Sequence, residues 1–284
     1  MGFMTRLLIA FVLLAALGCS SSSKQADAPP TTTTSANPSK APGAQVVNFE
    51  IGNQKRTAIL VPPTDRSKPV PVVFAFHGHG GSGRNFQRRM GIEKLWPNAV
   101  VLYPDGVPGH PGKTDPDGTK PGWQTIAGED GDRDLAFFDV MLKSVGEIFN
   151  LDRDRIYVVG HSNGSAFASL LLNQRGKQIA AVANLSAQPP ARFLDTDPVR
   201  SIFMAMGRRD QVVPFANQER SIPLVESKLG VDTSTAKSSG DLRQEFAPKN
   251  IELATYVYNG GHAPPPEIPP LVVKFFQRHS LGDG

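Results

Sequence analysis

Cysteine is almost missing from this chain. The 284 residues include one cysteine, Cys19, which lies close to the N-terminus. A disulfide within the chain needs two cysteines, so none can form. No group of cysteines and histidines has the spacing of a zinc site. The sequence therefore argues against a disulfide-braced scaffold and against a metal centre, and we expect no metal and no other cofactor.

Neither sign of charge dominates the chain. Lysine and arginine together number 30, aspartate and glutamate 26, and the formal net charge is +4. There is no basic run and no aromatic cluster of the kind that binds RNA. We therefore expect no nucleic-acid partner. The sequence does not fix the oligomeric state, and we expect a monomer.

The N-terminus carries an apolar segment that is too short to span a membrane in the mature protein. Met1–Arg6 has one positive charge, and Leu7–Leu17 is apolar. A small residue followed by the lone Cys19 resembles the lipobox of bacterial lipoproteins, although Ala16 stands where leucine is commoner. The resemblance implies cleavage before Cys19, diacylation of its thiol and export to the cell envelope. Ser20 favours the outer membrane, and a plain signal peptide of a secreted protein is the alternative.

Three regions are expected along the chain. Residues 1–18 would be the signal peptide. Residues 19–43 are rich in serine, threonine, proline and alanine and cannot bury enough apolar surface to fold, so we expect a disordered tether. Residues 44–284 would form one catalytic domain.

Within that domain, apolar segments of strand length alternate with segments of helical periodicity. Val46–Ile51 and Lys55–Val61 alternate apolar and polar residues, which predicts a half-exposed hairpin. Continuous apolar runs predict strands covered on both faces: Pro69–Phe76, Ala99–Tyr103, Ile156–Val159, Ile179–Ser186, Ser201–Gly207 and Ile251–Tyr258.

The predicted helices are Asn85–Trp96, Asp132–Phe149, the segment after Ser162, Phe215–Leu229 and Pro269–His279. Val107–Gly131 is a long loop, which in a compact domain is usually functional. Val231–Asp241 is interpreted as an irregular polar segment. Alternating strands and helices indicate an α/β domain with a doubly wound, mostly parallel sheet and helices on both faces.

The most informative motif is Gly-His-Ser-Asn-Gly at residues 160–164, between an apolar strand and a helix. This is the context of a nucleophile elbow. Gly160 and Gly164 would come too close together for any Cβ. Ser162 would then lie exposed at the tip of the strand, and the N–H of Asn163 would point at the same place. The sequence therefore predicts Ser162 as a hydrolase nucleophile.

A glycine-rich segment, His77–Gly83, follows another predicted strand. In hydrolases with this pattern, such a loop supplies the second oxyanion donor. We predict the N–H of His79 as that donor, with Gly80 as the alternative. A phosphate loop is disfavoured because no Gly-Lys-Ser/Thr ending follows. His77 and His79 lack the acid or cysteine that would complete a set of metal ligands.

A serine nucleophile needs a base, and the base needs an orienting acid. His262 follows the last predicted strand and is the predicted base, whereas His279 would face solvent at the end of the last helix. Asp210 follows the strand before it and is the predicted acid. Asp134 is interpreted as the cap or a first-turn residue of a helix rather than as a catalytic acid. The remaining candidates are the loop residues Asp195, Asp197, Asp232 and Asp241, and also His110, which precedes the nucleophile.

These motifs resemble the α/β-hydrolase superfamily, in particular its secreted polyhydroxybutyrate depolymerase/feruloyl esterase branch. The resemblance runs from about Phe49 to Phe276 and rests on Phe74–Gly78, Tyr103–Gly106, Gly122–Trp123, Asp134–Phe138, Tyr157–Gly164 and Gly260–His262. The chain departs from the pattern at Ser165, where a second glycine is usual, and at Ala263–Pro266, where a tryptophan is common. The bracing cysteines of many secreted members are also absent.

The resemblance implies a serine esterase that hydrolyses carboxylic esters through an acyl-enzyme. Ser162 would attack, His262 would act as base and then acid, Asp210 would orient His262, and the N–H groups of His79 and Asn163 would hold the oxyanion. Trp123 is a candidate wall of the substrate pocket, with packing in the core as the alternative. A peptidase or acyltransferase on the same triad, and a non-catalytic surface-binding lipoprotein, remain open.

Overall fold

The computed structural model describes residues 43–109, 111, 115–189 and 197–283. The predicted signal peptide and tether, Cys19, His110 and Asp195 lie outside these ranges. None of the helices in the described ranges is both long enough and apolar enough to cross a bilayer.

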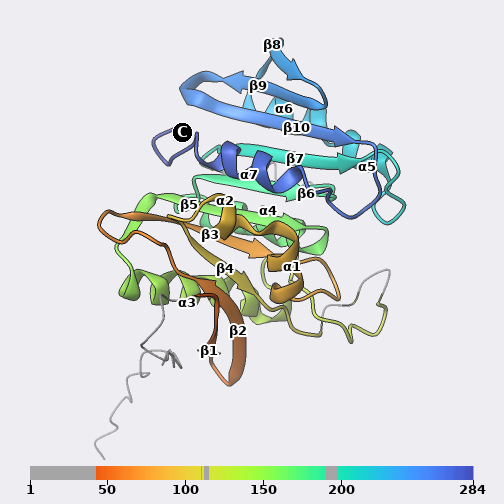
Figure 1. The fold of residues 1–284 in the computed structure, drawn as a ribbon. Coiled ribbons are helices and arrows are strands. Elements are labelled where there is room, and N and C mark those ends of the chain that lie inside the picture. The colour runs from red at the N-terminus through yellow and green to blue at the C-terminus, as the bar shows by residue number, and fades with distance from the viewer. Residues whose placement is uncertain (1–42, 110, 112–114, 190–196, 284) are drawn as a thin grey trace, which may run out of the picture.

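Within the described residues, ten strands form one sheet in the order β1-β2-β4-β3-β5-β6-β7-β10-β9-β8 (Figure 1). The strands are β1 Gln45–Ile51, β2 Gln54–Val61, β3 Val70–Phe76, β4 Val100–Pro104, β5 Leu151–His161, β6 Ala181–Leu185, β7 Ser201–Gly207, β8 Asp232–Ser239, β9 Leu242–Ala247 and β10 Ile251–Tyr258.

The six central strands, from β4 to β10 in the sheet order, pair in parallel, and antiparallel strands flank them on both sides. Every residue of β3, β4, β6 and β7 is buried. A strand covered on both faces has no polar side, which is why these segments read as continuous apolar runs. The predicted α/β fold with a doubly wound, mostly parallel sheet is confirmed.

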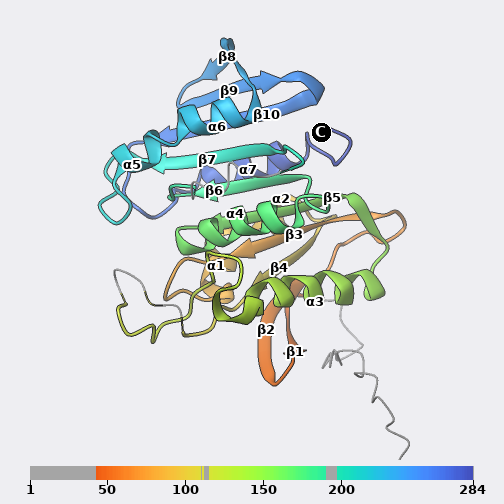
Figure 2. The same ribbon diagram turned by 180° about the vertical axis from the view of Figure 1, so that it is seen from behind.

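Helices cover both faces of the sheet. The helices α1 Gly83–Met90, α2 Ile92–Leu95 and α7 Ile268–Phe276 lie on one face (Figure 1), while α3 Arg133–Ile148, α4 Asn163–Arg175 and α6 Ile222–Leu229 lie on the other (Figure 2). The short helix α5 Phe215–Glu219 follows β7, and the 3₁₀ turns η1 Glu129–Asp132 and η3 Pro248–Asn250 complete the described elements. Two buried apolar clusters fill the two interfaces between helices and sheet.

The parallel register brings four loops to one edge of the sheet. Phe76 pairs with Gly160, and Gly207 pairs with Tyr258, so β3, β5, β7 and β10 end at similar heights. The loops that follow these strands carry His79, Ser162, Asp210 and His262. Residues far apart in the sequence therefore meet at the carboxyl edge, where ligands bind in such folds.

Three expectations about elements are wrong. Val231–Asp241 is not an irregular segment, because most of it forms strand β8 and pairs with β9 at the outer edge. The predicted helix Asn85–Trp96 breaks at Gly91, which has a left-handed φ of 49° and separates α1 from α2. The predicted helix Phe215–Leu229 divides into α5 and α6 before Pro223.

Asp134 lies in the first turn of α3, one of the two positions predicted for it, and Asp132 occupies the cap position. The Oδ1 of Asp134 lies 2.8 Å from Arg56 Nη1, and both side chains are fully buried. The prediction that His279 would face solvent is wrong. His279 is 2% exposed, and its Nε2 lies 2.8 Å from a carboxylate oxygen of Glu252 on β10.

Candidate active site

The turn between β5 and α4 is too tight for side chains at its two glycines. A Cβ on Gly160 would lie 2.1 Å from the carbonyl oxygen of Gly164, and a Cβ on Gly164 would lie 2.4 Å from that of Phe76. Ser162 between them has φ 54° and ψ −119°, a region that residues other than glycine rarely occupy. Close packing of the backbone thus forces Ser162 to the tip of the turn.

Ser165 ties this turn to two strands. Its Oγ lies 2.6 Å from the carbonyl oxygen of Gly160 and 3.0 Å from that of Leu185, and it accepts the N–H of Leu185 at 2.8 Å. The N–H of Ser162 also donates to the Leu185 carbonyl, at 2.8 Å. A serine in place of the usual second glycine therefore fixes the start of α4 against β5 and β6.

The loops after β7 and β10 bring Asp210 and His262 together. His262 Nδ1 lies 2.8 Å from Asp210 Oδ2, and the Asp210 side chain is fully buried while 21% of the His262 side chain is exposed. Asp210 also accepts the N–H groups of Val212 at 2.9 Å and Val213 at 3.0 Å, and Nε2 of Gln218 at 3.0 Å. These bonds hold a charged carboxylate in one orientation against the imidazole.

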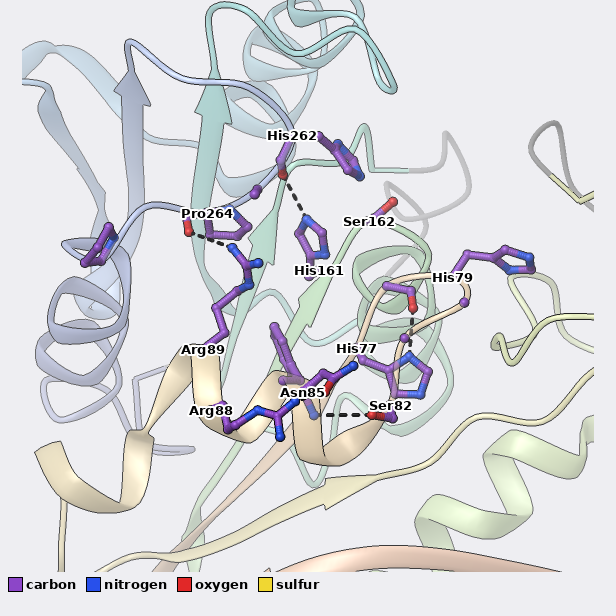
Figure 3. Close-up of a pocket in the computed structure, with 16 residues that line it drawn as sticks. His77, His79, Ser82, Asn85, Arg88, Arg89, His161, Ser162, His262 and Pro264 are labelled. Carbon is purple, nitrogen blue, oxygen red and sulfur yellow. Dashed lines mark hydrogen bonds between the residues drawn. The ribbon is translucent and has the colours of Figure 1, made fainter.

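Ser162 and His262 line one cavity of about 990 Å³. Figure 3 shows the Ser162 hydroxyl directed into the same space as the His262 ring. The cavity is bounded by the glycine-rich loop, by one side of α1 and by the segment that follows His262. The lining residues are His77–Ser82, Asn85, Phe86, Arg88, Arg89, His161, Ser162, His262–Pro264 and Pro266.

The glycine-rich loop packs directly against Ser162. A Cβ on Gly78 would lie 3.3 Å from Cβ of Ser162. The N–H of Gly80 already donates to the carbonyl of Pro121 at 2.7 Å, whereas no hydrogen bond within the described residues engages the N–H of His79. The N–H of Asn163 belongs to the first turn of α4 and has no partner in the helix. This geometry favours His79 over Gly80 as the second oxyanion donor.

The His79 side chain points away from the cavity (Figure 3) and is held by Asp115, at 2.9 Å between Nε2 and Oδ2. Asp115 also accepts the N–H of Lys120 at 2.8 Å and both the N–H and the hydroxyl of Thr119. The bond from the Lys120 backbone is the main cause that keeps the pKa of Asp115 well below its ordinary value. A charged carboxylate in the long loop therefore anchors the residue that carries the candidate donor.

Trp123 is not a pocket wall, and that prediction is wrong. Its side chain is fully buried and packs against Phe76 and Phe167, with ring centroids 5.1 and 5.5 Å apart. Its indole N–H donates to the carbonyl of His77 at 2.9 Å. The alternative of core packing holds: Trp123 supports the strand from which the glycine-rich loop emerges.

His77 is a structural residue in this arrangement. Its Nδ1–H donates to the carbonyl of Gly78 at 2.7 Å, and its Nε2 accepts the N–H of Gly106 at 2.9 Å. Burial lowers the pKa of His77, which favours the neutral ring that this pattern of bonds requires. Both ring nitrogens are thus engaged with the backbone.

Four side chains that shape this site were not predicted from the sequence. Gln218 holds Asp210, and Asp115 holds His79. The Asn163 amide bonds the backbone of Trp123 in both directions, at 2.8 and 3.0 Å. Arg89 lines the cavity from α1. A long loop with many polar residues was the only signal for Asp115. The elbow motif contains Asn163 but does not indicate the role of its side chain, and no motif marked Gln218 or Arg89.

No protein-family profile matches the chain. A putative esterase, NocK, from Nocardia uniformis subsp. tsuyamanensis is 27% identical over 151 residues, which cover 51% of this chain and 41% of that protein. A probable feruloyl esterase C from Aspergillus clavatus is 25% identical over 212 residues, which cover 70% of this chain and 71% of that protein. The chain thus spans less than half the length of the first of these relatives and about seven-tenths of the second.

Solved structures share the fold. A carboxylesterase from Bacillus cereus superimposes with a TM-score of 0.55 at 19% identity, over 78% of this chain and 94% of that one. An acetyl xylan esterase from Aspergillus awamori superimposes with a TM-score of 0.57 at 12% identity, with the same coverage. The central sheet and its flanking helices are therefore those of a known and widely used architecture.

Proposed function

We propose that this protein is a serine hydrolase that cleaves carboxylic esters through an acyl-enzyme. The esterase relatives and the α/β-hydrolase-like fold support this proposal. The observation that carries the proposal is the meeting of three loops at the carboxyl edge of the sheet. Ser162 stands at a strained turn, and His262 shares its cavity. Asp210 is fully buried behind His262 and lies within hydrogen-bond distance of it.

Each group has a role that its surroundings support. The Nδ1–H of His262 donates to Asp210, which leaves Nε2 unprotonated and able to accept the proton of Ser162 as its Oγ attacks the ester carbonyl. The N–H groups of Asn163 and His79 would bind the oxyanion of the tetrahedral intermediate, and loss of one such donor costs about 10²–10³ in rate. His262 then gives its proton to the leaving alcohol and activates the water that releases the acid.

For the substrate, we propose either a polyhydroxyalkanoate-type polyester or the feruloyl or acetyl groups of a polysaccharide. The sequence motifs support the first, and the names of two relatives and of one structural neighbour support the second. The open cavity of about 990 Å³ is large enough for either.

We also propose that the protein is lipid-anchored at Cys19 in the cell envelope, on the basis of the apolar segment Leu7–Leu17 and the small residue before the cysteine. Cys19→Ser should move the protein from the membrane fraction to the soluble fraction of the cells. Retention of that variant in the membrane fraction would contradict the proposal.

An ester panel tests the activity. We expect hydrolysis of p-nitrophenyl acetate, p-nitrophenyl butyrate and at least one of methyl ferulate and a 3-hydroxybutyrate oligomer, and no turnover by a folded Ser162→Ala variant. Cleavage of peptide anilides without cleavage of esters would indicate a peptidase on the same triad. An inactive wild-type protein would favour a binding lipoprotein, and full activity of Ser162→Ala would overturn the mechanism.

A further inference from the structure

One wall of the cavity is cationic, and the proposed mechanism makes no use of it. Helix α1 begins at its cap Ser82, whose Oγ accepts the N–H of Asn85, and ends at Gly91. Ser82, Asn85, Phe86 and Arg89 recur at intervals of three or four residues, so they share one side of the helix. All four line the cavity, together with Arg88.

Neither arginine is neutralised by a described carboxylate. Arg88 donates to the amide oxygen of Asn85, and Arg89 donates to the carbonyl of Pro264 at 3.3 Å. No ion pair within the described ranges involves either residue, and the cavity lining contains no aspartate or glutamate. A guanidinium has five N–H donors, so both side chains keep donors available for an anion.

The position of Arg89 relates it to one half of the ester. Its hydrogen bond reaches Pro264, two residues after the proposed base His262, and Figure 3 shows the Arg89 side chain directly below Pro264. The leaving oxygen must receive its proton from His262. The leaving oxygen of the ester must therefore lie beside His262, and an alcohol portion that continues toward Pro264 would come within reach of Arg89, while the acyl portion remains on Ser162.

The cavity also has an apolar surface, which Ala263, Pro264 and Pro266 provide. An alcohol with a short aliphatic chain could contact these residues while a charged end meets the arginines.

We propose that Arg89, with Arg88 beside it, binds a carboxylate on the alcohol portion of the ester. The favoured substrates would then be esters of hydroxycarboxylic acids whose own carboxyl group is free. This inference rests on the proposed esterase activity and narrows its substrate class. The arginines would distinguish an ester at the free carboxyl end of a hydroxy acid chain from a neutral ester within a polymer chain.

A matched pair of substrates tests this inference. The compounds 3-acetoxybutanoate and 3-acetoxybutanamide differ in the charge of the alcohol portion and have nearly the same size. We expect the wild-type kcat/KM ratio to favour the carboxylate by about fivefold, the upper end for an exposed ion pair. Arg89→Gln should bring the ratio close to one, Arg89→Lys should retain part of the preference, and 1 M NaCl should weaken it.

Two controls make the result specific. Arg84→Gln changes an exposed arginine of the same helix that does not line the cavity, and it should leave the ratio unchanged. Monoethyl succinate and ethyl succinamate carry the same difference in charge on the acyl portion. Their ratio should change less than twofold in Arg89→Gln.

The outcomes separate this inference from the esterase proposal. Equal hydrolysis of the carboxylate and the amide by the wild-type protein, or a preference that Arg89→Gln retains, would overturn the carboxylate site and leave the esterase intact. If Arg89→Gln lost a preference only for monoethyl succinate over ethyl succinamate, the carboxylate site would also be overturned, because Arg89 would then bind a charge on the acyl portion. Hydrolysis of none of the four esters would count against the esterase itself and against this inference with it.

Discussion

His161 Nε2 lies 2.9 Å from the main-chain carbonyl oxygen of His262. A carbonyl can only accept, so the ring nitrogen carries the proton and donates. The two imidazole rings also pack against each other, with centroids 4.8 Å apart. His161, the residue just before the proposed nucleophile Ser162, therefore holds the backbone of the proposed base His262.

The burial of His161 predicts a pH-dependent stability. Burial lowers the pKa of His161 to about 4, from an ordinary value of 6.5. Between these values the unfolded chain binds more protons than the folded one, so the free energy of unfolding rises with pH, by at most about 1.4 kcal/mol per unit. The contribution is complete above pH 6.5 and is lost as the pH falls to 4.

Urea unfolding of the wild-type protein and of His161→Gln between pH 4 and 7 measures this effect. Other groups titrate in both proteins, so the difference between the two curves isolates His161. We expect the wild-type advantage to shrink as the pH falls. Two parallel curves would show that His161 does not titrate in this way.

Asp210→Asn should lower kcat for a p-nitrophenyl ester by a factor on the order of 10³–10⁴. An amide would donate to His262 Nδ1 and move the ring proton to Nε2, where it blocks proton transfer from Ser162. Asp139→Asn is the control, because Asp139 pairs with Arg175 on the surface and lines no part of the cavity. A loss below tenfold in Asp210→Asn would remove Asp210 from the triad.

Asp115→Ala should lower kcat by about tenfold, less than the 10²–10³ expected for deleting an oxyanion donor outright. The change leaves His79 without its carboxylate partner and loosens the loop that presents the His79 N–H. We expect KM to change little, and the affinity for a boronic acid transition-state analogue to fall by the same factor as kcat. Reduced thermal stability with unchanged kcat and unchanged analogue affinity would mean that Asp115 is merely structural.

Gly164→Ala should destabilise the fold by about 4 kcal/mol or more, the range of severe core defects. The new methyl group would meet the carbonyl oxygens of Phe76 and His77 at 2.4 and 2.5 Å. Gly230→Ala is a control for strain without a clash: Gly230 has a positive φ of 67°, which Gly164 does not, but it has open space around it, so about 1–2 kcal/mol is expected. Equal losses of unfolding free energy in the two variants would contradict the steric account.

The central strands and the elbow were predictable because both depend on local sequence. Strands buried on two faces must be apolar throughout, and a turn without room for Cβ must use glycine. His262 and Asp210 could be inferred because each follows such a strand. His262 and Asp210 could be predicted to lie close together because the carboxyl ends of parallel strands meet at one edge of the sheet.

What could not be predicted depends on neighbours that are distant in the sequence. Strand β8 is exposed along almost all of its length, so it has no apolar alternation to reveal it. His279 looked like a surface residue until the fold placed Glu252 beside it. Trp123 lies within the long loop Val107–Gly131, yet three aromatic neighbours from other segments enclose it. Arg89 could not be predicted as a cavity residue, because only the packing of α1 against the segment after His262 places it there.

Labelling with a fluorophosphonate, followed by peptide mass spectrometry, tests the central claim most directly. Only a serine whose hydroxyl is activated by a base reacts readily with such a probe. We predict a single adduct on Ser162, lost in Ser162→Ala and after heat denaturation, and strongly slowed in His262→Ala. Absence of an adduct from the folded wild-type protein, or an adduct on another serine that persists in Ser162→Ala, would contradict the account.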